Sequence, residues 1–392
     1  MIRSLFKRSG LHFSGSLVSR IFTSTVYIVL SRFISPTEYG QATLVFTFVL
    51  LGSVVGDYGL SQWYQKQDNE SQAFRSFLHL RLIFAFISSL LLFFLATWLK
   101  WLPVPLAITA SLLLIPHAVL SIASAHLIRA KEVLKPSLQQ VIQAIPVLIV
   151  LFLRQRQVTV LEVASAYLIG DLIAVVLLFP RHKLKELGGS RSPLFATFRS
   201  SSKYALLNYT SATYARADSV LVRGYLGEAA LGFYGLAYRY LEYFAMLPSS
   251  LVQISFPIFA RDKKLGKAHI IKITMLMACV GMFFSVFLAL LASIIITTFH
   301  GPLYSPAIII MQILSATLFL LFINAPLSTY IQSSDMVKKF LPFGILNTSL
   351  NIALNIILIP LYGLQGAAWA MMITEGTGLM INGFFTYRLL TS

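Results

Sequence analysis

About twelve apolar stretches, each long enough to cross a lipid bilayer as a helix, follow one another along nearly the whole chain. Only 11% of the residues are charged and 57% are hydrophobic, with a mean hydropathy of +0.77. A soluble protein would carry about 25% charged residues. The ten-residue alternation of a membrane β-barrel is absent from the sequence. We therefore predict an all-α integral membrane protein with about twelve transmembrane helices.

The distribution of positive charge predicts the topology. The predicted spans cover residues 14–35, 39–61, 77–98, 104–128, 137–153, 158–179, 204–226, 229–256, 270–299, 304–331, 340–359 and 363–388. Of the 31 lysines and arginines, 23 fall on one set of connections and 5 on the other. Because positively charged loops stay in the cytoplasm, both termini are predicted to be cytoplasmic.

The chain is predicted to consist of two matched halves. The longest hydrophilic stretch, 181–203, is interpreted as a cytoplasmic linker between a six-helix lobe, 1–180, and a second six-helix lobe, 204–392. Residues 32–40 and 223–232 echo each other, since each has an Arg, a short turn and a Gly after an apolar span. Six helices per half give both lobes the same orientation, which predicts a pseudo-two-fold axis along the membrane normal.

Charge and motif content exclude several classes of function. The net charge of +17 is explained by topogenic lysines and arginines beside anionic lipid, and the sequence has no basic soluble module that would bind nucleic acid. Cys279 is the only cysteine and the seven histidines are scattered, so no metal site is expected. Nucleotide-binding loops and hydrolase or protease motifs are missing, and we therefore predict no enzymatic activity and no cofactor.

Charges inside the spans are the main clues to function, because a charge near the bilayer centre costs about 2.5–3.5 kcal/mol on insertion scales. In the first span, Arg20 lies on a polar helical face with Ser16, Tyr27 and Ser31. A structural arginine bonded to a neighbouring helix is one explanation. The polarity of the whole face favours the other, a water-accessible cavity.

The seventh span, 204–226, carries the strongest signal. Arg216 and Arg223 are seven residues apart and share a helical face, whereas Asp218 lies on another face. Residues two apart do not face each other on a helix, so Arg216 and Asp218 are not expected to pair. For Arg223 the alternative is that its long side chain simply reaches the outer surface.

Two acidic side chains in later spans have different interpretations. Arg239 and Glu242 are three residues apart and are predicted to pair within their own helix. Glu375 has no cation nearby in the sequence. It either takes up a proton or an ion, or it balances an arginine on another helix, and the sequence does not separate these roles.

Two further polar features are predicted to have ordinary structural roles. Asn347, Asn351 and Asn355 form a ladder with a spacing of four residues, which predicts hydrogen bonds between helices. Asp57 lies near the inner end of the second span and is predicted to be half-solvated.

Several segments together resemble a known family. They are Ser35-Pro-Thr-Glu-Tyr-Gly40, Asp57-Tyr-Gly-Leu60, the run from Arg216 to Tyr234 and the run from Asn351 to Ala368. Their order and their placement between spans resemble the oligosaccharide and O-antigen flippases of the multidrug/oligosaccharidyl-lipid/polysaccharide exporter superfamily. The resemblance covers most of the chain.

This resemblance implies two six-helix bundles around a central cavity and transport by alternating access. The implied substrate is an undecaprenyl-diphosphate-linked oligosaccharide, moved from the cytoplasmic to the periplasmic leaflet of a bacterial inner membrane. The other implied partners are membrane lipids, a proton or sodium gradient and polysaccharide polymerase machinery. A multidrug antiporter of the same superfamily is the first alternative, although arginines outnumber acids here. A membrane glycosyltransferase or polymerase is the second, although it would need a larger extramembrane loop.

We hypothesise that arginines bind the diphosphate, because a guanidinium group matches phosphate oxygens with paired hydrogen bonds. Tyrosine and asparagine side chains suit sugar hydroxyls. The expected substrate-binding residues are Arg20, Arg216, Arg223, Arg239, Tyr27 and Asn351. The expected residues for coupling to an ion or proton are Asp218 and Glu375.

Overall fold

The computed structural model describes residues 22, 25–68, 70–130, 132, 134–154, 157–180, 193–261, 263–334 and 336–391. In this part of the chain the backbone forms helices joined by short turns and contains no strand. Eight of the helices are long and apolar enough to cross a membrane, by length and composition. The prediction of an all-α integral membrane fold is confirmed.

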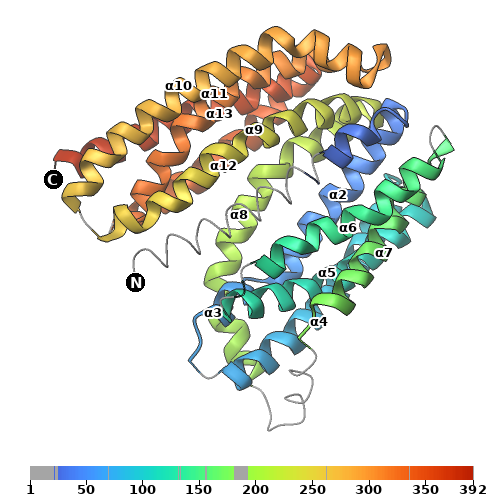
Figure 1. Ribbon diagram of the computed structural model, residues 1–392, viewed down its shortest axis with the longest axis horizontal. Helices are drawn as coiled ribbons and strands as arrows, with labels where there is room; N and C mark the ends of the chain where they lie inside the picture. The colour runs from blue at the N-terminus through green and yellow to red at the C-terminus, as the bar shows by residue number, and fades with distance from the viewer. Residues whose placement is uncertain are drawn as a thin grey trace. The chain divides into compact units, whose positions relative to one another are not determined.

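The helices follow one another with few residues between them (Figure 1). They are α2 (Pro36–Asp57), α3 (Leu60–Gln65), α4 (Glu70–Trp98), α5 (Val104–Arg129), α6 (Leu134–Arg154), α7 (Val160–Leu178), α8 (Leu194–Leu226), α9 (Glu228–Arg261), α10 (Lys263–Ile295), the π-helical turn η3 (Ile296–His300), the 3-10 turn η4 (Pro302–Tyr304), α11 (Ala307–Gln332), α12 (Val337–Tyr362) and α13 (Leu364–Thr391).

Each predicted span from 39–61 onward coincides with a helix, but three helices begin well before their predicted spans, among them α10, which begins at Lys263 instead of residue 270. Helix α4 begins at Glu70 and α8 begins at Leu194, so residues 194–203 of the predicted linker are helical. Hydropathy marks the part of a helix that lies in the bilayer, whereas a helix can continue into the polar region with charged side chains. Of the first predicted span, 14–35, the structure describes residues 22 and 25–35, and residues 25–30 are helical.

The described residues divide into two compact units. The C-terminal unit contains Tyr27–Gly40 and Ala217–Ser392, and the N-terminal unit contains Gln41–Arg216. Each unit is built around one helix: α5 packs against α3, α4, α6 and α7, while α11 packs against α9, α10, α12 and α13. The apolar windows of α5 and α11 are 67% and 56% buried, more than those of the other candidate spans.

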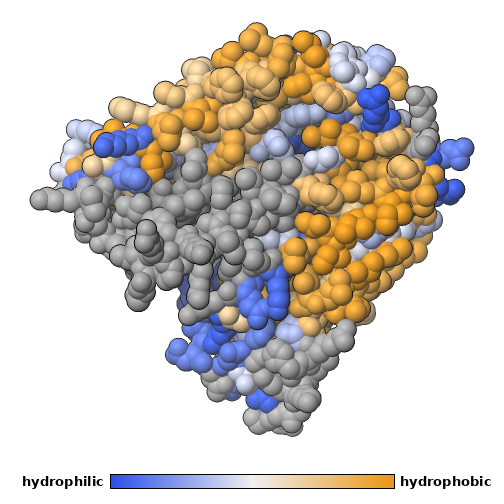
Figure 2. All heavy atoms as spheres, viewed as in Figure 1, coloured by the Kyte–Doolittle hydropathy of each residue, from blue (hydrophilic) through white to orange (hydrophobic). Residues whose placement is uncertain are grey.

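Apolar side chains cover the outside of both units. Phe152 is 80% exposed and Leu290 is 74% exposed, and many other large hydrophobic residues are similarly placed. Figure 2 shows these residues gathered over α6 and α7 in one unit and over α10 in the other. In water such patches are rare and small, so this surface indicates that lipid is the surrounding solvent. The chain is a multi-pass membrane protein.

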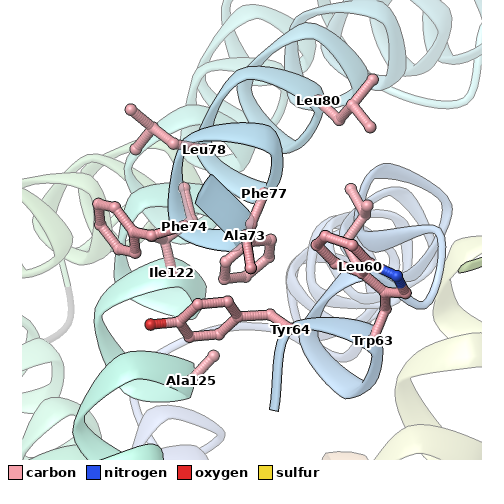
Figure 3. Packing of buried hydrophobic residues seen from close by; sticks show 10 residues of the cluster. All are labelled: Leu60, Trp63, Tyr64, Ala73, Phe74, Phe77, Leu78, Leu80, Ile122 and Ala125. Carbon is pink, nitrogen blue, oxygen red and sulfur yellow. The ribbon is translucent and has the colours of Figure 1, made fainter. Parts of the chain in front are cut away.

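A compact aromatic core holds α3 against α4 and α5 in the N-terminal unit (Figure 3). Tyr64 of α3 stacks on Phe77 of α4, with ring centroids 5.1 Å apart. At the edge of this core, Arg129 of α5 donates a 2.7 Å hydrogen bond to the backbone carbonyl of Tyr64. This bond adds a charged donor to a carbonyl at the end of α3 that also accepts the backbone N–H of Gln67 at 3.3 Å.

The two segments that echo each other in sequence cross at their glycines within the C-terminal unit. A Cβ atom at Gly40 would overlap the carbonyl oxygen of Glu228, and one at Gly232 would overlap the carbonyl oxygen of Pro36. Pro36 and Glu228 are the first residues of α2 and α9. The contact is therefore reciprocal, as expected when repeated segments meet, and only glycine lets the two backbones approach this closely.

Replacing Gly232 with alanine should destabilise the protein by about 1–3 kcal/mol, because the new methyl group forces the start of α2 away from α9. Gly344→Ala is the matched control, since nothing lies within 4 Å of a Cβ atom there. Thermal unfolding of both variants in detergent measures the difference. Equal unfolding midpoints for Gly232→Ala and Gly344→Ala would show that the close crossing contributes nothing to stability.

Candidate functional site

The structure brings two of the predicted substrate-binding residues together in the C-terminal unit. The guanidinium carbon of Arg239, on α9, lies 4.0 Å from the ring centroid of Tyr27. Arg239 Nη1 also donates a 2.8 Å hydrogen bond to Glu242 Oε2, which confirms the predicted pair within the helix. We call Tyr27, Arg239 and Glu242 the arginine–tyrosine cluster. Its charged side chains are 15% and 33% exposed, so a polar ligand can reach them.

A buried hydrogen-bond chain fixes the segment that carries Tyr27. Tyr240 OH lies 2.7 Å from His300 Nε2, and His300 Nδ1 lies 2.5 Å from Ser31 Oγ. Ser31 Oγ itself donates to the carbonyl of Ile28. One proton arrangement satisfies all three bonds: Tyr240 donates to Nε2 and Nδ1–H donates to Ser31. The chain ties Tyr27 to α9 and to η3, the kind of π-helical turn that occurs frequently at functional sites.

The predicted coupling residue Asp218 is buried on α8. One carboxylate oxygen accepts a 2.5 Å hydrogen bond from Tyr234 OH of α9, and the other accepts the backbone N–H of Ser219. Helical spacing could not identify Tyr234 as the partner of Asp218, because the contact joins two helices. A buried carboxylate that keeps two donors is suited to remain charged or to exchange a proton.

The two arginines of α8 have different environments. Arg223 donates a 2.8 Å bond from Nη2 to Glu228 Oε1 at the junction of α8 and α9, so it is held in an ion pair instead of reaching the surface alone. Arg216 is buried in the N-terminal unit. Arg20, the third predicted phosphate ligand, lies outside the described residues.

Glu375 is buried on α13 among carboxamide side chains. Asn324 of α11 donates from Nδ2 to Glu375 Oε2 at 2.8 Å and to its backbone oxygen at 3.0 Å. Asn382 in turn donates to Asn324 Oδ1 at 2.9 Å. The predicted interhelical role of Asn351 is confirmed, since its Nδ2 donates to Thr374 Oγ1 of α13 at 3.2 Å. Helices α11 and α13 thus meet at the Glu375 carboxylate, and Asn351 links α12 to the preceding residue of α13.

The prediction that Asp57 is half-solvated was wrong, and so was the charge count in which Arg81 belongs to a cytoplasmic connection. Asp57 is buried, not half-solvated, and Arg81 is 1% exposed inside α4 instead of lying among cytoplasmic flanking charges. Arg81 Nε lies 3.7 Å from Asp57 Oδ1, and Nη2 donates to Ser53 Oγ at 3.4 Å. The error arose because α4 begins at Glu70, which moves Arg81 three turns into the helix.

An apolar groove of about 150 Å³ runs between α2 and α4 in the N-terminal unit. Its walls include Phe48, Leu51, Leu91 and Leu95, and Ser88 is its polar exception. Ser88 and Arg81 both contact the position of Gly56, so the buried ion pair lies next to one end of the groove. A hydrocarbon chain matches this lining, because transferring apolar groups between apolar surroundings costs little.

The site chemistry is therefore of two kinds. The arginine–tyrosine cluster offers a cation on an aromatic face, which suits an anionic ligand with hydroxyl groups. Asp218 and Glu375 offer buried carboxylates, which suit a proton or a small cation.

Comparison with known proteins identifies relatives of this arrangement. The probable flippase AglR of Haloferax volcanii is 24% identical over 184 residues, which cover 44% of this chain and 38% of that protein. This chain thus matches well under half of that relative's length.

Solved structures share the fold over nearly the whole chain. The inward closed conformation of the lipid II flippase MurJ superposes with a TM-score of 0.75 at 16% identity, covering 95% of this chain and 86% of that one. An inward-facing multidrug resistance MATE family transporter of the MOP superfamily superposes with a TM-score of 0.73 at 14% identity, covering 98% of both chains. A family model described as polysaccharide biosynthesis protein matches residues 29–309, more than half of the chain, and the protein therefore belongs to this family.

Proposed function

We propose that the protein is a flippase that carries an undecaprenyl-diphosphate-linked oligosaccharide from the cytoplasmic to the periplasmic leaflet, for assembly of a surface polysaccharide or O-antigen. The observation that carries the proposal is the arginine–tyrosine cluster, a reachable guanidinium group on an aromatic face within a membrane protein of the polysaccharide biosynthesis family. It acts as a transporter by alternating access and catalyses no bond formation.

The polarity of such a substrate explains why charged and polar residues are needed inside the membrane. Its diphosphate and sugars lose their hydration in hydrocarbon, and an unpaired charge there costs several kcal/mol or more. Arginines replace the lost water at the phosphate oxygens with charge-assisted hydrogen bonds. Tyr27 suits the sugar hydroxyls, whereas the predicted sugar ligand Asn351 is buried and already hydrogen-bonded to Thr374 and Asn355. Arg20, Arg216, Arg223 and Arg239 are the proposed sources of positive charge for the phosphate oxygens.

The relatives support this reading. AglR is a probable flippase and MurJ is a flippase for lipid II, a different lipid-linked molecule. We extend the flippase activity, but not either relative's own substrate, to this chain. The lipid tail stays in the membrane during transport, and the apolar groove between α2 and α4 provides a matching surface for it.

The transport cycle needs a driving force, and a buried carboxylate can bind the proton or sodium ion whose gradient provides it. We assign Asp218 and Glu375 to coupling with a proton or sodium gradient. We also propose that both termini lie in the cytoplasm of a cell with an inner membrane. The lobes 1–180 and 204–392 would then be joined by the cytoplasmic segment 181–203. Delivery of the glycan to polysaccharide polymerase machinery follows on the periplasmic side.

A multidrug or organic-cation antiporter is the second candidate. The observation in its favour is the shared fold with MATE family transporters. Against it, a cationic drug would have to approach Arg239, whose positive charge disfavours it. Resistance to cationic drugs on overexpression, without any change in surface glycan, would favour this candidate.

A genetic experiment tests the proposed flippase. Deletion of the gene in its own host should abolish the surface polysaccharide and accumulate lipid-linked glycan. Arg216→Ala and Arg20→Ala should fail to restore transport, and Arg216→Lys should restore part of it, because lysine keeps the charge but not the paired bonds. Arg199→Ala is the control, an exposed arginine on the same helix. Normal transport by both alanine variants at normal expression would overturn the assignment of these arginines.

A further inference from the structure

A second buried carboxylate lies in the N-terminal unit, apart from the residues assigned above. Asp171 is buried on α7 and accepts a hydrogen bond from Gln143 Nε2 of α6. His117 of α5 places its Nδ1 4.0 Å from Asp171 Oδ2. Three neighbouring helices therefore each contribute one polar side chain to a single point in an otherwise apolar bundle.

The backbone explains how this point is formed. A Cβ atom at Gly170 would lie 2.7 Å from the Cα and carbonyl oxygen of Gln143, so the glycine allows α7 to approach α6 closely. The next residue, Asp171, is thereby held against the carboxamide of Gln143. The His117 side chain is 36% exposed, whereas Asp171 is buried beneath it.

The helices packed on Asp171 each contribute a polar side chain near it, and only some of these side chains are charged or titratable. Helix α5 contributes His117, and α6 contributes only the neutral Gln143. Beyond His117, the charge of Arg81 on α4 acts on the imidazole, and Arg81 itself pairs with Asp57 of α2. On α7 itself Tyr167 lies one turn away, with its ring edge-on to Phe46.

No lysine or arginine forms an ion pair with Asp171 within the described part of the chain. The oxygen ligands that a metal cation requires are also few here, because the neighbours are one amide and one imidazole. A proton needs only the carboxylate oxygen itself. The surroundings of Asp171 therefore fit a proton better than a sodium ion.

Comparison of the two units strengthens this reading. Asp171 lies eleven residues after Val160, where α7 begins, and Glu375 lies eleven residues after Leu364, where α13 begins. Each helix is the third of a consecutive trio, α5–α6–α7 or α11–α12–α13, whose first member is the central helix of its unit. Each carboxylate accepts a hydrogen bond from a carboxamide, that of Gln143 or of Asn324.

We propose that Asp171, with His117 as its proton-exchange partner, is a proton-binding site in the N-terminal unit that matches Glu375 in the C-terminal unit. In one step the carboxylate takes up a proton from His117 or from water, and in the reverse step it returns the proton. The role in transport rests on the proposed flippase function, since the site is one of two whose protonation drives the cycle. The protonation itself does not depend on what is transported.

The direct test is infrared difference spectroscopy of the full-length purified protein in lipid nanodiscs while the pH is varied. The wild type should show the carbonyl stretch of a protonated carboxylic acid at low pH, and Asp171→Asn should lose one component of that band. His117→Gln should keep the component but shift the pH at which it disappears. Asp68→Asn, an exposed aspartate with the same substitution, is the control and should lose only a component that appears below about pH 5, where exposed carboxylates protonate.

Two outcomes would overturn the proton site. One is a set of identical spectra for the wild type and Asp171→Asn at every pH. The other is a band that responds to sodium and not to pH when choline replaces sodium in the buffer. Both readouts are independent of transport.

A transport assay in vesicles separates this proposal from the proposed function. With an imposed pH gradient, Asp171→Asn should translocate the lipid-linked probe only at its rate without a gradient, while Asp171→Glu should keep part of the gradient response. A wild type that moves no probe would contradict the flippase function and leave the infrared result to decide the site. A wild type whose gradient response survives in Asp171→Asn would contradict coupling through Asp171.

Discussion

Arg239→Ala should remove most translocation of the lipid-linked glycan, with an apparent affinity about 10- to 100-fold weaker than in the wild type. A charge-assisted hydrogen bond contributes about 1.5–3 kcal/mol, and each 1.4 kcal/mol corresponds to about a factor of ten in affinity. The side chain is partly exposed and stacked on Tyr27, so its loss removes a ligand for phosphate and the ion pair with Glu242. Accumulation of lipid-linked glycan in cells that express the variant measures the effect.

Matched substitutions separate charge from geometry. Arg239→Lys should behave more like alanine than like arginine, because lysine loses the planar stack and the paired donors. Tyr27→Phe should keep part of the transport, since the ring face remains but the hydroxyl that suits the sugar is lost, whereas Tyr27→Ala should lose transport. Arg388→Ala is the control, because Arg388 stacks on Phe384 at 4.8 Å but is exposed near the chain end. Wild-type transport by Arg239→Ala at equal expression would remove the cluster from the mechanism.

Arg81→Met should destabilise the protein by about 3–5 kcal/mol, the largest stability effect that we expect. The substitution leaves Asp57 buried without its cation, and breaking a buried ion pair on one side has this cost. Arg81 is 1% exposed and also bonds Ser53, so no water replaces the lost partner. The midpoint of thermal unfolding in detergent, followed by tryptophan fluorescence, provides the measurement.

The double variant Arg81→Met with Asp57→Leu identifies the cause. Replacing both partners with apolar side chains of similar size should recover most of the stability, because no charge is left buried. If the double variant were as unstable as Arg81→Met alone, packing around Arg81 would explain the loss and the ion pair would not. Glu132→Gln provides a surface comparison, since its pair with Lys135 is exposed and should contribute little.

The sequence predicted the helices well because hydropathy reports directly on the lipid environment. Every predicted span from 39–61 onward coincides with a helix, and the glycine echo at Gly40 and Gly232 marks a real crossing. The same measure failed at helix ends. Glu70 and Arg75 look like loop residues by hydropathy, yet they belong to the first turns of α4, and Arg81 was misplaced for that reason.

Predictions for single helices succeeded where the partner lies on the same helix. Arg239 and Glu242 pair as their spacing indicates. Partners from other helices were not predicted: Asp218 meets Tyr234 of α9, and Asp171, which the sequence did not single out, meets residues of α5 and α6. Helical periodicity defines a face but contains no information about which helix covers it, so these contacts required the structure.

Whether the protein is a flippase for a lipid-linked glycan is decided by a translocation assay with the purified protein in vesicles. The probe is undecaprenyl-diphosphate carrying a fluorescent sugar, and its arrival in the outer leaflet is followed with an impermeant quencher. The translocation rate of the wild type should lie well above that of protein-free vesicles, and the rate of Arg239→Ala should lie near that background. Background rates for the wild type, in vesicles where the same protein transports a cationic drug, would contradict the flippase function.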